Sequence, residues 1–165
     1  MRLAFYVIFM EKTKVLFVCL GNICRSPMAE AVFADIVSKA GLSHAFEINS
    51  AGTANYHIGK KPDHRTIQVC QEHKVEINHK AQQFTSEDFA NYDYIIAMDH
   101  ENYKNILRLI RNEHDKAKVF MMRDFSEPNQ NLIVPDPYYG TLNDFENVYQ
   151  ILHKSCTECL EYILK

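Results

Sequence analysis

The feature that most constrains the fold is a short apolar strand that leads directly into a turn and a helix. Residues 14–19 (KVLFVC) are rich in apolar and β-branched residues and show no polar alternation. Such a run is typical of a strand that is buried on both faces of a parallel sheet. Gly21 and Asn22 follow, and Ser26-Pro27 indicates a helix start, because proline fits the first helical turn. Cys19 is therefore predicted to end a central strand.

Strand and helix patterns alternate along the rest of the chain. Gly41 is expected to end the first helix. We expect further strands at 46–50, 92–98 and 118–122, and helices at 63–73, 102–111 and from 142 onward. Thr85 and Asp88 are expected to cap a short helix, and residues 123–140 to form a long loop. This alternation predicts an α/β sandwich on a parallel sheet of about four strands. Ligands of such folds bind at the carboxyl ends of the strands, which singles out the position of Cys19.

Length, charge and cysteine content narrow the class of protein. The chain of 165 residues suffices for one domain with a substantial core. A formal net charge of −3 argues against a whole-domain electrostatic grip on nucleic acid. Five cysteines, an odd number, do not resemble a secreted disulfide framework and favour a reducing compartment, so a cytoplasmic location is expected.

The first nine residues (MRLAFYVIF) are apolar and raise the question of targeting. The segment is too short to span a bilayer, and it lacks the small-residue cleavage site of a signal peptide. We expect residues 1–12 to be an N-terminal extension outside the core fold, with Met10 as an alternative start. Since no other stretch approaches transmembrane length, no membrane partner is expected.

The loop from Cys19 to Pro27 carries groups suited to phosphate. Gly21 and Asn22 tolerate positive φ, so backbone N–H groups can point inward, and the helix start adds about half a positive charge. Arg25 offers a planar fork for two phosphate oxygens. The positive field favours the thiolate of Cys19, to which the Ser26 hydroxyl can donate. The predicted phosphate-binding residues are Leu20, Gly21, Asn22, Ile23, Cys24, Arg25 and Ser26.

With its neighbouring motifs, this loop resembles the low-molecular-weight protein tyrosine phosphatases. The motifs fall in family order: Ser50-Ala51-Gly52-Thr53, His79-Lys80-Ala81, Ala97-Met98-Asp99 and Asp136-Pro137-Tyr138-Tyr139-Gly140. The resemblance covers residues 13–165 and implies one phosphatase domain there. It implies a Rossmann-like three-layer sandwich with helices on both faces of a four-stranded sheet of order 2-1-3-4.

The resemblance also implies an activity. Phosphotyrosine on proteins, or a small aryl phosphate, would be hydrolysed through a phosphocysteine intermediate, with inorganic phosphate as product. Cys19 would be the nucleophile and Arg25 the phosphate ligand. An acid phosphatase that acts as a monomer without cofactor or metal is expected.

Asp136 is the candidate general acid. Cleavage of a phosphate monoester requires protonation of the leaving oxygen, which a carboxylic acid opposite the nucleophile can supply. Pro135 and Pro137 restrict the backbone on both sides of Asp136 and hold its carboxyl in place. In the family, this residue is the general acid and later activates the water that hydrolyses the phosphocysteine.

Aromatic residues are the candidate walls of the site. Tyr138 and Tyr139 follow the acid directly, and Tyr56 follows the second predicted strand. In the family, an aromatic residue at the position of Tyr56, often Trp, and the tyrosine pair flank the substrate ring. Such walls would make a slot that phosphotyrosine fills and phosphoserine does not. The chain has no Trp, so substrate preference could differ here.

Several polar residues match family positions that brace the phosphate loop. They are Asn22, Ser50, His79 and Asp99. A buried polar network would hold the turn of the loop in place.

The remaining cysteines divide into two groups. In the family, the residue at Cys24 can form a reversible disulfide with the nucleophile, which protects it from over-oxidation. Cys156 and Cys159 have zinc-like spacing, but two further ligands are not evident, and we expect them and Cys70 to pack in the core.

Three alternatives share parts of this pattern. A thioredoxin-coupled arsenate reductase needs two further redox cysteines after the second helix, and only Cys70 lies near that segment. An arginine phosphatase typically carries Thr where this loop has Ile23. A non-catalytic phosphate-binding module would not need Cys19, Arg25 and Asp136 intact.

Overall fold

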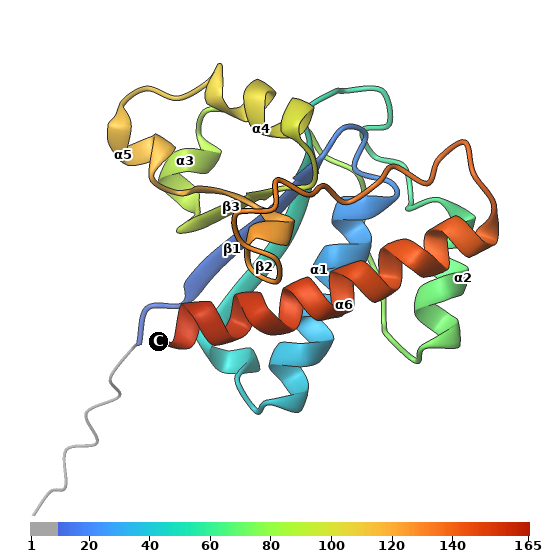
Figure 1. Ribbon diagram of the computed structural model, residues 1–165. Coiled ribbons are helices and arrows are strands. Elements are labelled where there is room, and N and C mark those ends of the chain that lie inside the picture. Colours follow the sequence, from blue (N-terminus) through green and yellow to red (C-terminus); the bar gives the residue numbers. More distant parts are fainter. Residues whose placement is uncertain (1–9) are drawn as a thin grey trace, which may run out of the picture.

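A four-stranded parallel sheet forms the centre of the molecule (Figure 1). The computed structural model describes residues 10–165. The strands are β1 (Thr13–Cys19), β2 (Phe46–Gly52), β3 (Tyr94–Ala97) and β4 (Val119–Met121), in the order β2-β1-β3-β4. This order confirms the expected 2-1-3-4 arrangement. The expected N-terminal extension falls largely on residues 1–9, which lie outside the described residues.

Helices connect the strands. They are α1 (Arg25–Lys39), α2 (His64–Glu72), α3 (Asp88–Asn91), α4 (His100–Leu107), α5 (Glu113–Lys116) and α6 (Leu142–Leu164), with two 3₁₀ turns, η1 (Ser43–Ala45) and η2 (Met122–Asp124). Their ends have local causes. Asp63 accepts a hydrogen bond from the Arg65 N–H as the N-cap of α2. After α1, Gly41 adopts a φ of +74° and gives the backbone a left-handed end that glycine allows without strain.

Most predicted elements have somewhat different bounds in the structure; β2, for example, continues to Gly52 instead of ending at residue 50. The helix expected at 102–111 spans 100–107, because Asp99 caps its start and the N–H groups of Leu109 and Ile110 bond to the carbonyls three residues earlier. The strand expected at 92–98 spans 94–97, since the Tyr92 N–H closes the end of α3 instead of joining the sheet. The strand expected at 118–122 spans 119–121, because Met122 begins η2.

Both faces of the sheet are covered, as the apolar run in β1 predicted. Val15 and Phe17 pack in a cluster with α1, α2 and α6. Leu16 and Val18 point to the opposite face and pack in a second cluster with residues of α3 and α4. Alternate residues of a strand point to opposite faces, so one short strand contributes to both layers. The three layers of the expected sandwich are therefore present.

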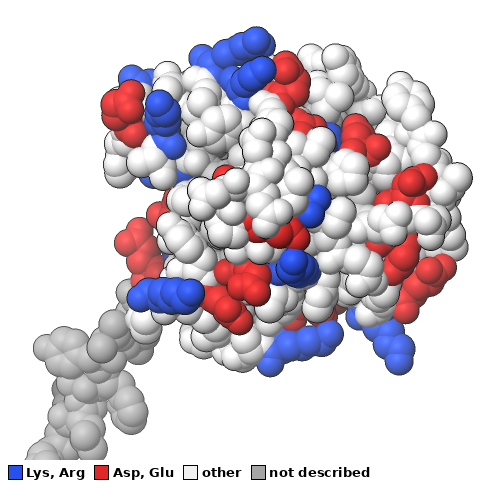
Figure 2. Space-filling model, in the orientation of Figure 1, with Lys and Arg blue, Asp and Glu red and all other residues white. Residues whose placement is uncertain are grey.

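The carboxyl ends of the strands lie together at one edge of the sheet. Cys19 at the end of β1 is in register with Gly52, and Val18 is in register with Ala97 of β3. The loops that follow β1, β2 and β3 consequently begin side by side. None of the helices within residues 10–165 is both long and apolar enough to cross a membrane. On the face shown in Figure 2, basic and acidic side chains are interspersed.

Candidate active site

The loop between β1 and α1 wraps around the thiol of Cys19. Asn22 adopts a φ of +56°, which turns the chain and brings its N–H to 3.3 Å from the Cys19 Sγ. The hydroxyl oxygen of Ser26 lies 3.0 Å from the same sulfur. Gly52 lets the loop pack closely against β2, because any side chain there would clash: a Cβ would lie 2.7 Å from the Leu20 carbonyl oxygen. The sulfur is thus surrounded by hydrogen-bond donors that suit a thiolate.

Arg25, the first residue of α1, lies buried below the loop with 2% of its surface exposed. One guanidinium nitrogen donates to the Asp99 carboxylate (2.6 Å) and to the Val134 carbonyl (3.0 Å). The other lies 3.4 Å from the Asp136 carboxylate. Burial opposes the charge, but negative charge at Cys19, Asp99 and Asp136 outweighs burial and raises the pKa of Arg25. Arg25 is therefore a fixed cation within the site.

The long loop before α6 carries Asp136 to the same place. Its carboxylate accepts a hydrogen bond from the Tyr138 N–H (3.2 Å). Arg65 holds the loop from the side of α2, because it donates to the carbonyls of Tyr138 (3.0 Å) and Gly140 (3.1 Å). Asp63 in turn holds the guanidinium of Arg65 through both carboxylate oxygens, and this bidentate contact lowers the pKa of Asp63.

A cavity of about 330 Å³ joins these parts. Its lining residues are Cys19, Leu20, Gly21, Ile23, Cys24, Arg25, Tyr56, His57, Asp136, Tyr138 and Tyr139. The tyrosines form its outer rim: Tyr56 is 69% exposed and Tyr139 is 97% exposed, and the rings of Tyr138 and Tyr139 meet edge to face. The cavity is therefore charged at its base and aromatic at its mouth.

A buried polar network lies behind the loop and centres on Asn22. Its amide nitrogen donates to Ser26 (2.8 Å) and to Ser50 (3.0 Å). Its amide oxygen lies 2.7 Å from His79 Nε2 and accepts the N–H of Gln82 (2.9 Å). With all these partners, the side chain fixes the positive-φ turn of the loop.

Glu30 completes the network on the far side. One carboxylate oxygen accepts the Ser50 hydroxyl (2.5 Å) and lies 3.0 Å from His79 Nδ1. The sequence reasoning did not single out this residue. The available signal was its position one helical turn after Ser26, which places both side chains on one face of α1.

The structure brings all the sequence-predicted site residues together. The predicted residues that do not line the cavity lie directly behind it: Asn22, Ser26, Ser50 and His79 in the network, and Asp99 on Arg25. Sequence reasoning missed Glu30, Arg65 and Gln82 because their contacts join segments that are far apart in the chain, and it missed Asp63 because its role depends on the distant contacts of Arg65.

The other cysteines are buried. Cys24 lines the cavity, and burial, followed by the nearby carboxylate of Asp63, raises the pKa of its thiol well above the usual range. Burial also raises the pKa of Cys70 to about 12. Cys156 and Cys159 pack in the core. Within residues 10–165, no group of three or more His, Cys, Asp or Glu side chains is arranged to hold a metal ion.

An α/β sandwich that presents a loop-bound thiol, a buried arginine and a carboxylate around one cavity defines a cysteine-dependent phosphatase. Comparison with known proteins identifies its family. Residues 14–165 match the family model of the low molecular weight phosphotyrosine protein phosphatases. The chain belongs to this family of hydrolases.

Its relatives agree in sequence and structure. It is 49% identical over 148 residues to the low molecular weight phosphotyrosine protein phosphatase of Saccharomyces cerevisiae, covering 87% of this chain and 91% of that protein. The human protein of that name is 44% identical over 148 residues, covering 89% and 93%. A crystal structure of a protein tyrosine phosphatase from Entamoeba histolytica matches with a TM-score of 0.88 and 38% identity, covering 93% and 97%.

Proposed function

We propose that this protein hydrolyses phosphotyrosine on proteins, and small aryl phosphates, through a phosphocysteine intermediate at Cys19. The observation that carries the proposal is the meeting of three groups at one cavity: the Cys19 thiol, the Arg25 guanidinium and the Asp136 carboxylate. Cys19 would be the nucleophile, Arg25 the phosphate ligand, and Asp136 the general acid and base.

In the first step, the phosphate dianion binds the inward N–H groups of the loop, residues 20–26, and Arg25. The Cys19 thiolate attacks phosphorus, so an S–P bond forms while the bond from phosphorus to the phenolic oxygen breaks. Asp136 transfers its proton to that oxygen, and the phenol leaves neutral. The contact between Arg25 and Asp136 (3.4 Å) supports a position of the acid beside the bound phosphate.

In the second step, water replaces the phenol. Asp136, now a carboxylate, takes a proton from the water as its oxygen attacks phosphorus. The S–P bond breaks, inorganic phosphate is released and the thiolate of Cys19 is restored. The Ser26 hydroxyl at 3.0 Å favours this thiolate as a leaving group by donating a hydrogen bond to it.

The aromatic rim supports phosphotyrosine as the substrate. Tyr56, Tyr138 and Tyr139 surround the mouth of the cavity, where they can contact the ring of phosphotyrosine. Ile23 lies on the cavity wall and presents an apolar surface, which suits a phenol better than the charged guanidinium of phosphoarginine. The choice between phenol and guanidinium needs an argument because a structure of the Drosophila arginine phosphatase also resembles this chain, at 30% identity and a TM-score of 0.86.

We further propose that residues 13–165 act as a single phosphatase domain, as a monomer in the cytoplasm, without cofactor. The family match over residues 14–165 supports the domain bounds. The five free, buried cysteines support a reducing location. Ser50, His79 and Asp99 would act as supporting residues that hold the loop and Arg25.

The test is a substrate panel with the purified full chain: phosphotyrosine peptide, phosphoserine peptide, phosphoarginine, and arsenate with thioredoxin. We expect phosphotyrosine to be hydrolysed with the highest kcat/KM. Cys19→Ser should abolish hydrolysis of p-nitrophenyl phosphate and still bind inorganic phosphate, which shows that the variant is folded. Unchanged turnover in this variant, or a preference for phosphoarginine or arsenate, would contradict the proposal.

A further inference from the structure

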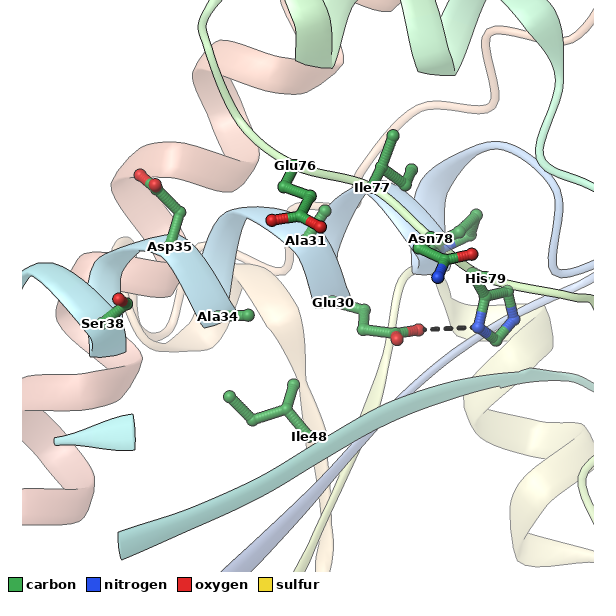
Figure 3. A pocket seen from close by; sticks show the side chains of 11 residues that line it. Glu30, Ala31, Ala34, Asp35, Ser38, Ile48, Glu76, Ile77, Asn78 and His79 are labelled. Carbon is green, nitrogen blue, oxygen red and sulfur yellow. Dashed lines mark ion pairs between the residues drawn. The ribbon is translucent and has the colours of Figure 1, made fainter. Parts of the chain in front are cut away.

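A second cavity, of about 310 Å³, is lined by Glu30 and His79 of the polar network and is separate from the catalytic cavity (Figure 3). Residues of α1, Ile48 of β2 and the segment 76–79 enclose it. Two of its lining residues belong to that network, because Glu30 contacts Ser50 and His79 contacts Asn22. Apart from Glu30 and His79, none of its lining residues has a role in the proposed reaction.

The floor of this cavity is apolar. Pro27, Ala31 and Ala34 of α1, Ile48 of the sheet and Ile77 of the covering segment supply carbon surface. Small side chains at Ala31 and Ala34 leave the space between helix and segment open, as Figure 3 shows. A volume of this size is at the lower end of the range for small-molecule sites. A ligand with an apolar body of about ten heavy atoms would fit.

The rim is acidic, and this feature is independent of the apolar floor. Glu30, Asp35 and Glu76 line the cavity, and no Lys or Arg is among its lining residues. Asp35 pairs with the exposed amine of Lys39 (2.7 Å), whereas Glu76 pairs with no cation of the described residues. The remaining polar lining groups are Ser38, Asn78 and His79.

Glu30 has one free acceptor toward this space. Its Oε2 serves both Ser50 and His79, while no protein donor within residues 10–165 reaches its Oε1. This oxygen is therefore available to accept a hydrogen bond from a donor of a ligand. Figure 3 shows this carboxylate facing the cavity beside His79.

We propose that this second cavity binds a small organic cation, a primary amine or amidine with an apolar body. The body lies against Ala34, Ile48 and Ile77, and the cationic group donates to Glu30 Oε1 within the field of Asp35 and Glu76. An ammonium group beside Oε1 draws the carboxylate of Glu30 away from Ser50 and His79. The support of Asn22 then weakens, and turnover falls; this coupling rests on the proposed function, whereas the binding does not.

The test uses 2-phenylethylamine as the cation and 2-phenylethanol as its neutral isostere. Both are titrated into the full-length protein and followed by amide NMR shifts, with saturating inorganic phosphate present so that the catalytic cavity stays filled. We expect the amine to shift the amides of Ala31, Ala34, Ile48 and Ile77, with a Kd of about 1 mM or lower. The alcohol should bind at least about tenfold more weakly.

Two substitutions on the rim and one outside it test the charges. Asp35→Asn and Glu76→Gln should each weaken binding of the amine about two- to fivefold, the effect typical of exposed charge pairs. Glu158→Gln, an exposed carboxylate of α6 outside the cavity, should leave it unchanged. Equal affinity for amine and alcohol, equal affinity of the rim variants and the unaltered protein, or shifts centred elsewhere would overturn the proposal.

Turnover of p-nitrophenyl phosphate tests the coupling separately. Saturating amine should lower kcat about twofold or more with little change in KM, and the double variant Asp35→Asn/Glu76→Gln should need a higher amine concentration for the same response. A kcat unaffected by saturating amine overturns the coupling. Absence of turnover without any amine would contradict the proposed function instead, and the NMR titration would still report on the cavity.

Discussion

Removal of the Asp99 carboxylate tests how the arginine of the site is held. One oxygen of Asp99 accepts from Arg25 at 2.6 Å, and the other accepts the Asn102 N–H at 2.8 Å as the N-cap of α4. One side chain therefore has two separable roles. Asp99→Ala removes both, whereas Asp99→Asn retains an oxygen for the cap and removes the charge.

The magnitude follows from burial and from the partners that remain. Leaving a buried charge without its partner costs about 3–5 kcal/mol. The Asp99 side chain is 19% exposed, and Arg25 keeps the Val134 carbonyl at 3.0 Å, so the lower part of that range applies. Loss of an N-cap adds about 1 kcal/mol. We expect Asp99→Asn to lower the free energy of unfolding by about 3 kcal/mol, at the lower end of that range, and Asp99→Ala by about 1 kcal/mol more.

Urea unfolding at pH 7 measures these differences, with Asp124→Asn as the control. Asp124 is an exposed carboxylate of η2 that accepts no hydrogen bond from the described residues, and its variant should be neutral within about 0.5 kcal/mol. The activity of both Asp99 variants should fall about tenfold or more in kcat/KM, since an unheld guanidinium no longer presents its fork to the phosphate.

Two results would refute this reasoning. If Asp99→Asn were as stable as the unaltered protein, the ion pair with Arg25 would not stabilise the buried guanidinium. If the Asn and Ala variants were equally destabilised, the cap on α4 would contribute nothing.

Three further predictions concern the acid, the second loop cysteine and a peripheral ion pair. Asp136→Ala should reduce hydrolysis strongly for aryl phosphates with poor leaving groups and weakly for those with good ones, so an equal loss across a leaving-group series would contradict acid catalysis. After peroxide treatment, the Cys19 sulfenic acid should condense with the Cys24 thiol to a disulfide and water. Because burial raises the pKa of Cys24, this step should accelerate with pH; mass spectrometry would detect it, and Cys24→Ser should instead reach the sulfinic acid. A pH-independent rate would argue against Cys24 as the attacking thiol. The guanidinium of Arg111 lowers the pKa of Asp115 to about 2, below its value in the unfolded chain. The pair therefore stabilises the fold above about pH 4, and the difference in unfolding free energy between the protein and Asp115→Asn should shrink as the pH falls toward 2; a constant difference over that window would contradict the assignment.

The sequence predicted what local patterns determine. The apolar run of residues 14–19 indicated a strand buried on both faces, and β1 contributes alternate residues to both core clusters. The loop that follows is contiguous in the chain, so its glycine, arginine and serine could be assigned a common ligand from their position between a buried strand and a helix start. Element ends were less predictable. Tyr92 has a strand-forming side chain, yet its N–H completes a helix end.

Contacts between distant segments escaped the sequence reasoning for a physical reason. Arg65 lies on α2, and nothing in its neighbourhood indicates that its guanidinium holds carbonyls 73 and 75 residues away. Glu30 likewise contacts residues far away in the chain: its partners are Ser50 of β2 and His79. A motif shows which groups react, while the groups that hold them are selected by the packed geometry, where many polar residues could occupy one position.

The same distinction explains why the second cavity could not be foreseen. It arises between α1 and the segment 76–79, whose sequences show no shared motif, and its carboxylates are ordinary surface residues when considered one at a time. Glu30 and His79 link it to the network behind the catalytic loop, since both line the cavity and contact Ser50 and Asn22, respectively. A ligand of this cavity would therefore act on the reaction through the pair of Glu30 and His79, and the rim variants at Asp35 and Glu76 separate binding there from the integrity of the loop.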